Sequence, residues 1–164
     1  MYNKSKLKKF IADGKKNVLA FDKKEGWVVD GYAMYTTKSP VMESVLTDAF
    51  YKTDSVYIRN NIEEQTGFPF STIIEKDHRE AKLLEVTPFI YRDDKYDARI
   101  FLDQDGVEVH CQQKYLDILD DYINYRYTQH SSLSSIYIWC GDELLGLILP
   151  IRVSEPARYQ VVRS

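Results

Sequence analysis

The feature that most constrains the fold is the apolar run at residues 144–149, Leu-Leu-Gly-Leu-Ile-Leu, which is followed directly by Pro150. A run of six residues is too short for a core helix and has the length of a strand. The run begins a terminal strand predicted over residues 144–153. Because this strand is apolar on both faces until Pro150, we expect it to be buried beneath helices and not to be an exposed edge. We expect Leu147 and Leu149 to be core residues, and Pro150 to end the strand pairing.

Eight other segments have the composition of strands. The sequence Asp105-Gly106 between two of them is a tight-turn signal, and the lysine-rich residues 23–26 predict a hairpin between the first two. The segments are residues 17–22, 26–36, 55–59, 83–91, 99–102, 107–111, 125–130 and 136–139.

Three segments have helical spacing. Residues 5–13 place apolar side chains on one face, and Gly14 is the expected stop. Pro40 follows Ser39 and is typical of a first helical position, with the helix running to about residue 51. Residues 113–122 predict a third helix. Its expected buried side chains are Leu116, Leu119 and Ile123, or their neighbours one position round the helix.

The order of these segments predicts an α+β protein with mainly antiparallel sheets. At 164 residues the chain has room for two small parts, each with some core. We place them at residues 1–95, with a basic lead helix and an extra helix, and at residues 96–164. Residues 60–82 carry loop signals.

The second part resembles a known family. Residues 114–119, Lys-Tyr-Leu-Asp-Ile-Leu, precede Ser-Ile-Tyr-Ile-Trp at 135–139, and the last strand reads on into Leu-Pro-Ile-Arg. Over residues 107–153 this order resembles the last subdomain of the bacterial DNA sliding clamp. The resemblance implies a clamp-like domain of two halves, each a helix with an antiparallel sheet. The helix at residues 40–51, the loop at 60–82 and the tail after Val153 depart from the clamp pattern.

In sliding clamps the residues around the terminal Pro and Arg line the apolar pocket that holds partner peptides. The resemblance therefore implies partner binding by Leu149, Pro150, Ile151 and Arg152. Taken from the residues alone, these are ordinary sheet positions, with Pro150 ending the pairing, and this second interpretation is the one we favour.

Charge is distributed unevenly along the chain. Residues 1–24 hold eight lysines against two aspartates, a net charge of +6, whereas residues 25–150 carry a net charge of −11. The basic segment predicts contact with phosphate if nucleic acid is bound at all. An ordinary solvated surface explains the same run equally well. The lysines concerned are Lys4, Lys6, Lys8, Lys9, Lys15 and Lys16.

No pattern of catalytic residues stands out. The residue types of His110, Cys111, His130 and Cys140 could bind a metal, but neighbouring strand residues such as His110 and Cys111 point to opposite faces. Residues 103–106 resemble the start of a calcium loop without its closing acid, and the serines after His130 lack a nucleophile elbow. Residues 80–82, Glu-Ala-Lys, match the end of a nuclease metal site by only three letters. We therefore predict no catalytic site, no metal and no cofactor.

The two cysteines form no motif and indicate a reducing compartment. The lysine-rich start has no apolar core typical of a signal peptide, and no run approaches membrane-spanning length. These features predict a cytoplasmic protein that does not enter a membrane.

Two functions remain open. The first is a non-enzymatic, clamp-like accessory protein of a phage or mobile element, which binds DNA or replication proteins and forms homo-oligomers if it closes a ring. The second is a phage-borne inhibitor of a host defence system, such as an anti-CRISPR protein, that binds a host nucleic-acid-processing protein through acidic and tyrosine-rich faces. The net charge of −11 favours the second, and the basic lead segment favours the first.

Overall fold

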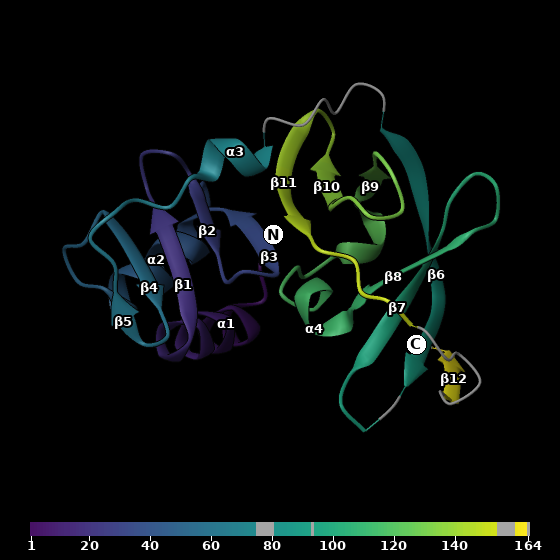
Figure 1. The fold of residues 1–164 in the computed structure, drawn as a ribbon, viewed down its shortest axis with the longest axis horizontal. Coiled ribbons are helices and arrows are strands. Elements are labelled where there is room, and N and C mark those ends of the chain that lie inside the picture. Colours follow the sequence, from purple (N-terminus) through teal and green to yellow (C-terminus); the bar gives the residue numbers. More distant parts are fainter. Residues whose placement is uncertain (75–80, 93, 154–159, 164) are drawn as a thin grey trace. The chain divides into compact units, whose positions relative to one another are not determined.

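The computed structural model describes residues 1–74, 81–92, 94–153 and 160–163 (Figure 1). Contacts between Cα atoms group the chain into two compact units. Unit 1 comprises Met1–Lys76 with Ile118–Asp120, and unit 2 comprises Asp77–Asp117 with Asp121–Ser164. Each unit combines helical segments with antiparallel strands, so the α+β class expected from the sequence is confirmed, with sheet predominating.

Unit 1 is built on five antiparallel strands in the order β5-β4-β1-β2-β3. The predicted strand at residues 55–59 is confirmed to the residue as β4. The elements are α1 (Lys4–Lys16), β1 (Val18–Asp22), β2 (Trp27–Val29), β3 (Ala33–Thr36), α2 (Pro40–Ala49), β4 (Ser55–Arg59), β5 (Ile62–Glu63) and α3 (Phe70–Ile74).

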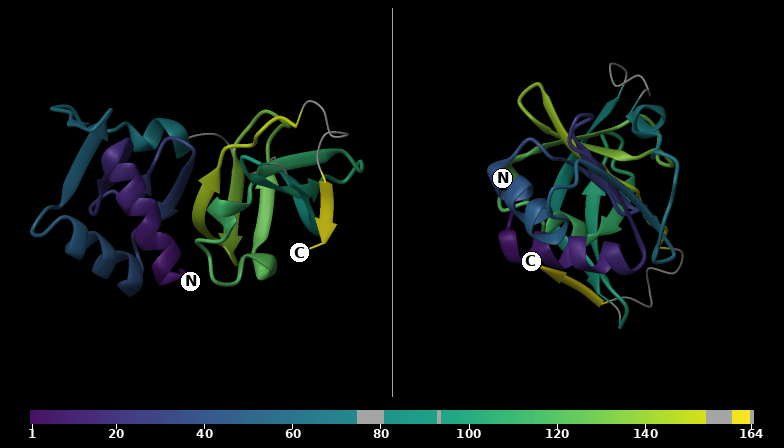
Figure 2. Two further views of the ribbon diagram at one scale, coloured as in Figure 1. Left: turned by 90° about the horizontal axis from the view of Figure 1, so that it is seen from below. Right: turned by 90° about the vertical axis from the view of Figure 1, so that its left-hand side faces the viewer.

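The two long helices of unit 1 cover one face of its sheet, as Figure 2 shows. From α1, Leu7, Phe10 and Ile11 are buried, as their spacing predicts. Gly14 is buried too, and the helix continues past it to Lys16, so its predicted role as a stop is wrong. A Cβ at Gly14 would lie 2.9 Å from Leu19 Cδ1, so the glycine allows close packing of α1 on β1.

The strand expected at residues 26–36 is interrupted. Asp30 Oδ1 accepts hydrogen bonds from the backbone N–H groups of Tyr32 and Ala33, at 2.8 and 3.0 Å. Gly31 between them has a φ of +100°, a conformation that glycine adopts without strain. This turn reverses the chain, so β2 and β3 become neighbouring antiparallel strands.

Unit 2 has six antiparallel strands in the order β11-β10-β9-β6-β7-β8, with β12 on the free side of β6. The elements are β6 (Lys82–Arg92), β7 (Asp97–Leu102), β8 (Glu108–Gln112), α4 (Gln113–Leu116), the 3₁₀ turn η2 (Tyr122–Asn124), β9 (Arg126–Gln129), β10 (Ile136–Cys140), β11 (Glu143–Ile148) and β12 (Gln160–Arg163).

Strand β6 is long enough to serve two sets of neighbours. Its first residues pair with β9, whereas its second half pairs with β7. The pairing shifts between Val86 and Ile90, where Thr87 Oγ1 donates to the carbonyl oxygen of Ile100 at 2.7 Å. After β11, the N–H of Ile151 donates to the carbonyl oxygen of His110 on β8. The chain thus links the two ends of the strand order.

The helix expected at residues 113–122 is only four residues long in α4, so the prediction is wrong in extent. Residues 118–120, which follow α4, pair instead with the first three residues of the chain. The N–H of Asn3 donates to the carbonyl oxygen of Ile118, Leu119 forms a bridge with Tyr2, and the N–H of Asp120 donates to Met1. This pairing uses the backbone groups that a longer helix needs.

Of two burial predictions near the end of the chain, the structure confirms one and contradicts the other. Leu147, on β11, is 3% exposed and belongs to the core as predicted. Leu149 lies just past the end of β11 and is 40% exposed, so its predicted burial is wrong. Ile123, expected on the buried face of the third helix, lies in η2 and is 61% exposed.

Candidate functional site

The basic surface predicted from the sequence lies on α1. All of the lysines named above belong to this helix or its ends, and all are exposed. Leu7, Phe10 and Ile11 hold the opposite face in the core of unit 1, so the lysine side is presented on a fixed backbone. Asp13 is the acidic side chain within the helix.

Two of these lysines have partners within unit 1. Lys9 Nζ lies 3.0 Å from Asp13 Oδ2, an exposed pair one turn apart. Lys15 Nζ donates to the carbonyl oxygen of Ala49 at 3.1 Å and lies 4.9 Å from the centre of the Phe50 ring. Lys15 therefore caps the C-terminal end of α2, where a cation is favourable.

A shallow groove of about 320 Å³ runs between α1 and α2. Lys8 and Lys15 stand on its α1 side and Asp48 on its α2 side. Ala12 and Ala49 contribute small side chains, which keep the groove open. The groove extends the lysine surface towards α2.

The four residues predicted to bind a partner differ in their exposure and in their contacts. Leu149 and Arg152 are exposed. Pro150 is half-buried, and Ile151 packs against a small core cluster of unit 2 and bonds to β8. Ile151 thus has a structural role, whereas Leu149 and Arg152 present their side chains to solvent.

A buried arginine, which the sequence analysis missed, organises the interior of unit 2. Arg99 is 1% exposed. Its guanidinium donates to Gln113 Oε1 at 2.8 Å, to the carbonyl oxygen of Thr87 at 2.9 Å and to Tyr122 Oη at 2.7 Å. Gln113 Nε2 in turn donates to Asp117 Oδ1 at 2.8 Å. Gln113 thus connects the buried guanidinium to the carboxylate of Asp117.

Burial also raises the pKa of two side chains near Arg99, those of Cys111 and Tyr127. Desolvation raises the pKa of the Cys111 thiol, opposed by the nearby positive charge of Arg99. Desolvation likewise raises the pKa of Tyr127, whose hydroxyl donates to the carbonyl oxygen of Tyr122 at 2.6 Å. Burial thus favours the neutral thiol of Cys111, which is fully buried in the core of unit 2.

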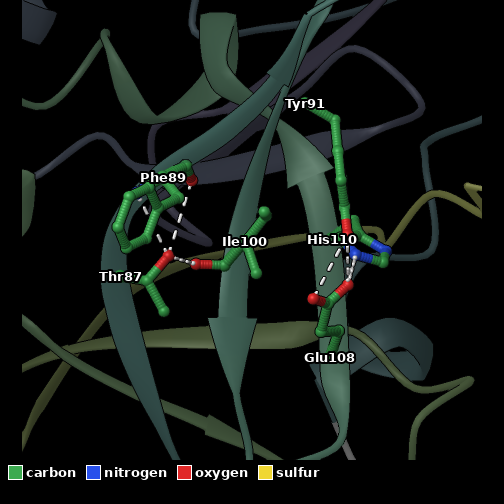
Figure 3. A network of polar contacts seen from close by, with 6 residues as sticks. All are labelled: Thr87, Phe89, Tyr91, Ile100, Glu108 and His110. Carbon is green, nitrogen blue, oxygen red and sulfur yellow. Dashed lines mark hydrogen bonds and ion pairs between the residues drawn. The ribbon is translucent and has the colours of Figure 1, made fainter. Parts of the chain in front are cut away.

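A second polar cluster lies on the opposite face of β6, β7 and β8 (Figure 3). Tyr91 Oη donates to Glu108 Oε2 at 2.8 Å, and His110 Nε2 lies 3.0 Å from the same carboxylate oxygen. The Tyr91 and His110 rings meet edge to face, with centroids 5.3 Å apart. Burial and the Glu108 carboxylate raise the pKa of Tyr91. The spacing Glu-x-His on one strand is the sequence signal for this pair.

Among the described residues, no three His, Cys, Asp or Glu side chains converge as metal ligands do. His110 and Cys111 face opposite sides of β8, as strand alternation predicts. Residues 103–106 form a turn in which Asp103 Oδ1 accepts from the N–H groups of Asp105 and Val107. Glu80 of the Glu-Ala-Lys tripeptide lies outside the described residues.

No helix within the described ranges has the length and apolar character needed to cross a membrane. No family model, curated protein or solved structure matches the chain.

Proposed function

We propose that this chain is a non-enzymatic accessory protein that binds nucleic acid through the lysine surface of α1. The observation that carries the proposal is the exposure of Lys4, Lys6, Lys8 and Lys16 on one well-packed helix. Ammonium groups at such positions neutralise phosphates and release counterions, which drives sequence-independent binding.

The arrangement of the lysines suits a phosphate backbone. Lys4 and Lys8 are one turn apart on α1, about 6 Å along the helix axis. Lys15 lies on the same side two turns further on, beside the groove between α1 and α2. These side chains form a row, and no acidic side chain of α1 lies within that row.

In the clamp-like form of the proposal, the helix that contacts DNA has to be a different one. A clamp lines its DNA channel with long helices, and α4 has only four residues. The segment after it carries Asp117, Asp120 and Asp121, which repel phosphate. Contact with DNA is therefore assigned to α1, and any ring or homo-oligomer is built around that helix.

The test compares two triple variants with the same change in net charge. Lys4, Lys6 and Lys8 are replaced by Glu in one variant. The control replaces Lys52, Lys82 and Lys114, exposed lysines far from α1 in the sequence. Binding to a fluorescent DNA duplex and to a single strand is measured by anisotropy over a range of salt concentrations.

We expect the α1 variant to lose at least tenfold in affinity and to show a flatter salt dependence. The control should bind within about threefold of the parent protein, because lysines outside the interface act only through long-range charge. Equal weakening of both variants, or a parent protein that does not bind DNA, would refute the proposal.

A second function, inhibition of a host defence protein, is favoured by a separate observation. Three large apolar side chains project from turns of unit 2: Leu133 is 91% exposed, Ile123 is 61% and Val107 is 52%. A protein partner that covered these side chains would remove their apolar surface from water, which favours association. Replacing all three with Ser should abolish inhibition of a target effector and leave DNA binding unchanged. Undiminished inhibition by that variant would refute this function.

A further inference from the structure

A small hollow in the surface of unit 1 lies beside the start of α2. It has a volume of about 210 Å³ and is lined by Lys23, Thr37, Lys38, Glu43 and Leu46. Pockets that hold drug-sized ligands measure roughly 300–1,000 Å³, so this hollow suits a smaller group. Leu46 is fully buried and contributes apolar surface, beside which charges are screened less than in open water.

Thr37 is the residue of this hollow whose polar side chain is not used by the fold. The residue is 9% exposed. Its backbone is held on both sides, because its N–H donates to the carbonyl oxygen of Gly26 at 2.9 Å and its own carbonyl oxygen accepts from the N–H of Ser39 at 2.8 Å. The hydroxyl, in contrast, makes no hydrogen bond to any described residue and is not sealed within the core. A hydroxyl with so little access to water is costly to leave without a partner, so a group bound in the hollow would stabilise it.

Two lysine side chains border the same hollow. Among the described residues, neither Lys23 nor Lys38 forms an ion pair or a side-chain hydrogen bond. Lys23 is half-buried, and its backbone N–H donates to the carbonyl oxygen of Asp54 at 2.9 Å. The Lys38 side chain lies along the turn between β1 and β2, where a Cβ at Gly26 would be 3.5 Å from Lys38 Cε. The two positive charges thus reach the hollow from separate segments of unit 1.

The helix that starts beside the hollow adds to this positive potential. α2 has ten residues and begins at Pro40, directly after Ser39. Ser39 occupies the N-cap position without making a side-chain cap, so it leaves the first N–H groups of the helix unsatisfied. The partial positive charge of a helix N-terminus favours an anion. Glu43 is the acidic residue of the lining, and the two lysines outweigh its charge.

We propose that this hollow binds a single phosphate group, either inorganic phosphate or the phosphate of an ester. Phosphate oxygens accept hydrogen bonds from several donors at once, and lysine is a common phosphate-binding residue. Lys23 and Lys38 supply the positive charge, and the Thr37 hydroxyl donates to a phosphate oxygen. The hydroxyl adds a directed hydrogen bond, which the row of lysines on α1 does not need. The inference is independent of nucleic-acid binding by α1.

The test is a titration of the full chain with inorganic phosphate, followed through the backbone amide signals of Thr37, Lys38 and Glu43 by NMR. Ionic strength and a neutral pH are held constant, and chloride replaces phosphate in the reference titration. We expect the amide signals to shift saturably with phosphate and not with chloride, because a bound anion changes the field at the start of α2.

Two variants remove one donor each. Thr37→Val keeps the shape of the side chain without its hydroxyl and should weaken phosphate binding about fivefold, the effect of one hydrogen bond. Lys38→Gln should weaken binding about tenfold, because a charge-assisted contact is lost. The matched control is Lys24→Gln, the same change at an exposed lysine outside the lining. It should bind within about twofold of the parent protein, because solvent and salt screen its charge.

A second titration identifies the source of the phosphate. Its probe is a single-stranded DNA without terminal phosphates, which offers only backbone diesters. Binding of this DNA at a lower phosphate-group concentration than inorganic phosphate, with the same losses in Thr37→Val and Lys38→Gln, would support the site and assign it to a nucleic-acid backbone. The reverse order, with the same losses, would support the site and assign it to free phosphate or a monoester.

Amide signals of β4 report whether each variant remains folded. If Thr37→Val loses them, Lys38→Gln, at an exposed position, carries the test with its control. The site would be overturned if phosphate produced no saturable shift at the start of α2. A folded Thr37→Val protein that binds phosphate like the parent would overturn it too, as would equal weakening by Lys38→Gln and Lys24→Gln.

Discussion

Arg99 is a buried residue whose side chain joins several segments in the interior of unit 2. Its side chain reaches three acceptors on three segments: Gln113, the backbone of Thr87, and Tyr122, whose ring it also faces at 5.4 Å. A buried guanidinium is costly to desolvate, and removing it leaves these acceptors without their donor. The arginine thereby ties β6, β7 and the segment between β8 and β9 together.

We predict that Arg99→Met lowers the free energy of unfolding by about 3 kcal/mol or more, because one buried and two partly buried acceptors lose this donor at once. Urea denaturation monitored by circular dichroism measures the change. The control is Arg126→Met, an exposed arginine 5.3 Å from the Trp139 ring, which should cost about 1 kcal/mol or less. Equal costs for the two variants would show that the Arg99 network does not stabilise the fold.

At the scale of elements, α1 combines a rigid buried face with an exposed charged one. Its start is capped by Asn3, whose Oδ1 accepts from the N–H of Lys6 at 3.2 Å. Its end lies at Lys16, with the N–H of Asn17 donating to the carbonyl oxygen of Gly14. The glycine is retained within the helix because α1 and β1 approach closely there.

We predict that Gly14→Ala destabilises the protein by about 1–2 kcal/mol, although alanine is the better helix former by about 1 kcal/mol. The new methyl group would lie 2.9 Å from Leu19 Cδ1 and 3.2 Å from Leu19 Cβ, and Leu19 is fully buried. Thermal melting measures the effect. Lys16→Ala, an exposed change in the same turn, should alter stability by less than about 0.5 kcal/mol. A stabilised Gly14→Ala protein would contradict the close packing.

At the scale of the whole molecule, net charge is unevenly distributed along the chain. The net charge is −3, yet residues 1–24 carry +6 and residues 25–150 carry −11. If nucleic acid binds to α1 as proposed, this distribution would confine the contact to the basic segment and make it sensitive to salt. The core of unit 2, in contrast, depends on a strand near the end of the sequence.

We predict that a chain ending at Glu143 does not fold cooperatively. The truncation removes Leu145, Leu147 and Ile148, each at most 3% exposed. Burial of each such side chain contributes about 2 kcal/mol, so their loss approaches the whole stability of a typical domain. Differential scanning calorimetry makes the test, with a chain ending at residue 158 as the control. The control lacks β12 and should still melt cooperatively, because β12 is mostly exposed.

The part of this fold that could be predicted from the sequence is the local part. Apolar spacing gave the buried face of α1, Pro40 marked the start of α2, and β-branched and aromatic residues marked β4 at its exact bounds. The apolar density before Pro150 indicated β11 and the burial of Leu147. In each case the information lies within a few residues, because helix periodicity and strand alternation are local properties.

Long-range pairing decided the rest. The third expected helix shrank to α4 because the first three residues of the chain pair with residues 118–120, more than a hundred positions away. Arg99 is buried because Gln113, Thr87 and Tyr122 converge on it, and no spacing along the sequence signals that convergence.

The candidate sites divide in the same way. The lysines of α1 are neighbours in the sequence, so their shared surface follows from composition and helix geometry alone. Tyr91 reaches Glu108 and His110 only because β6, β7 and β8 pair side by side. Sequence by itself determined which residues are charged, apolar or able to turn. The tertiary structure alone decided which distant side chains meet, because that choice depends on the pairing of strands across the whole chain.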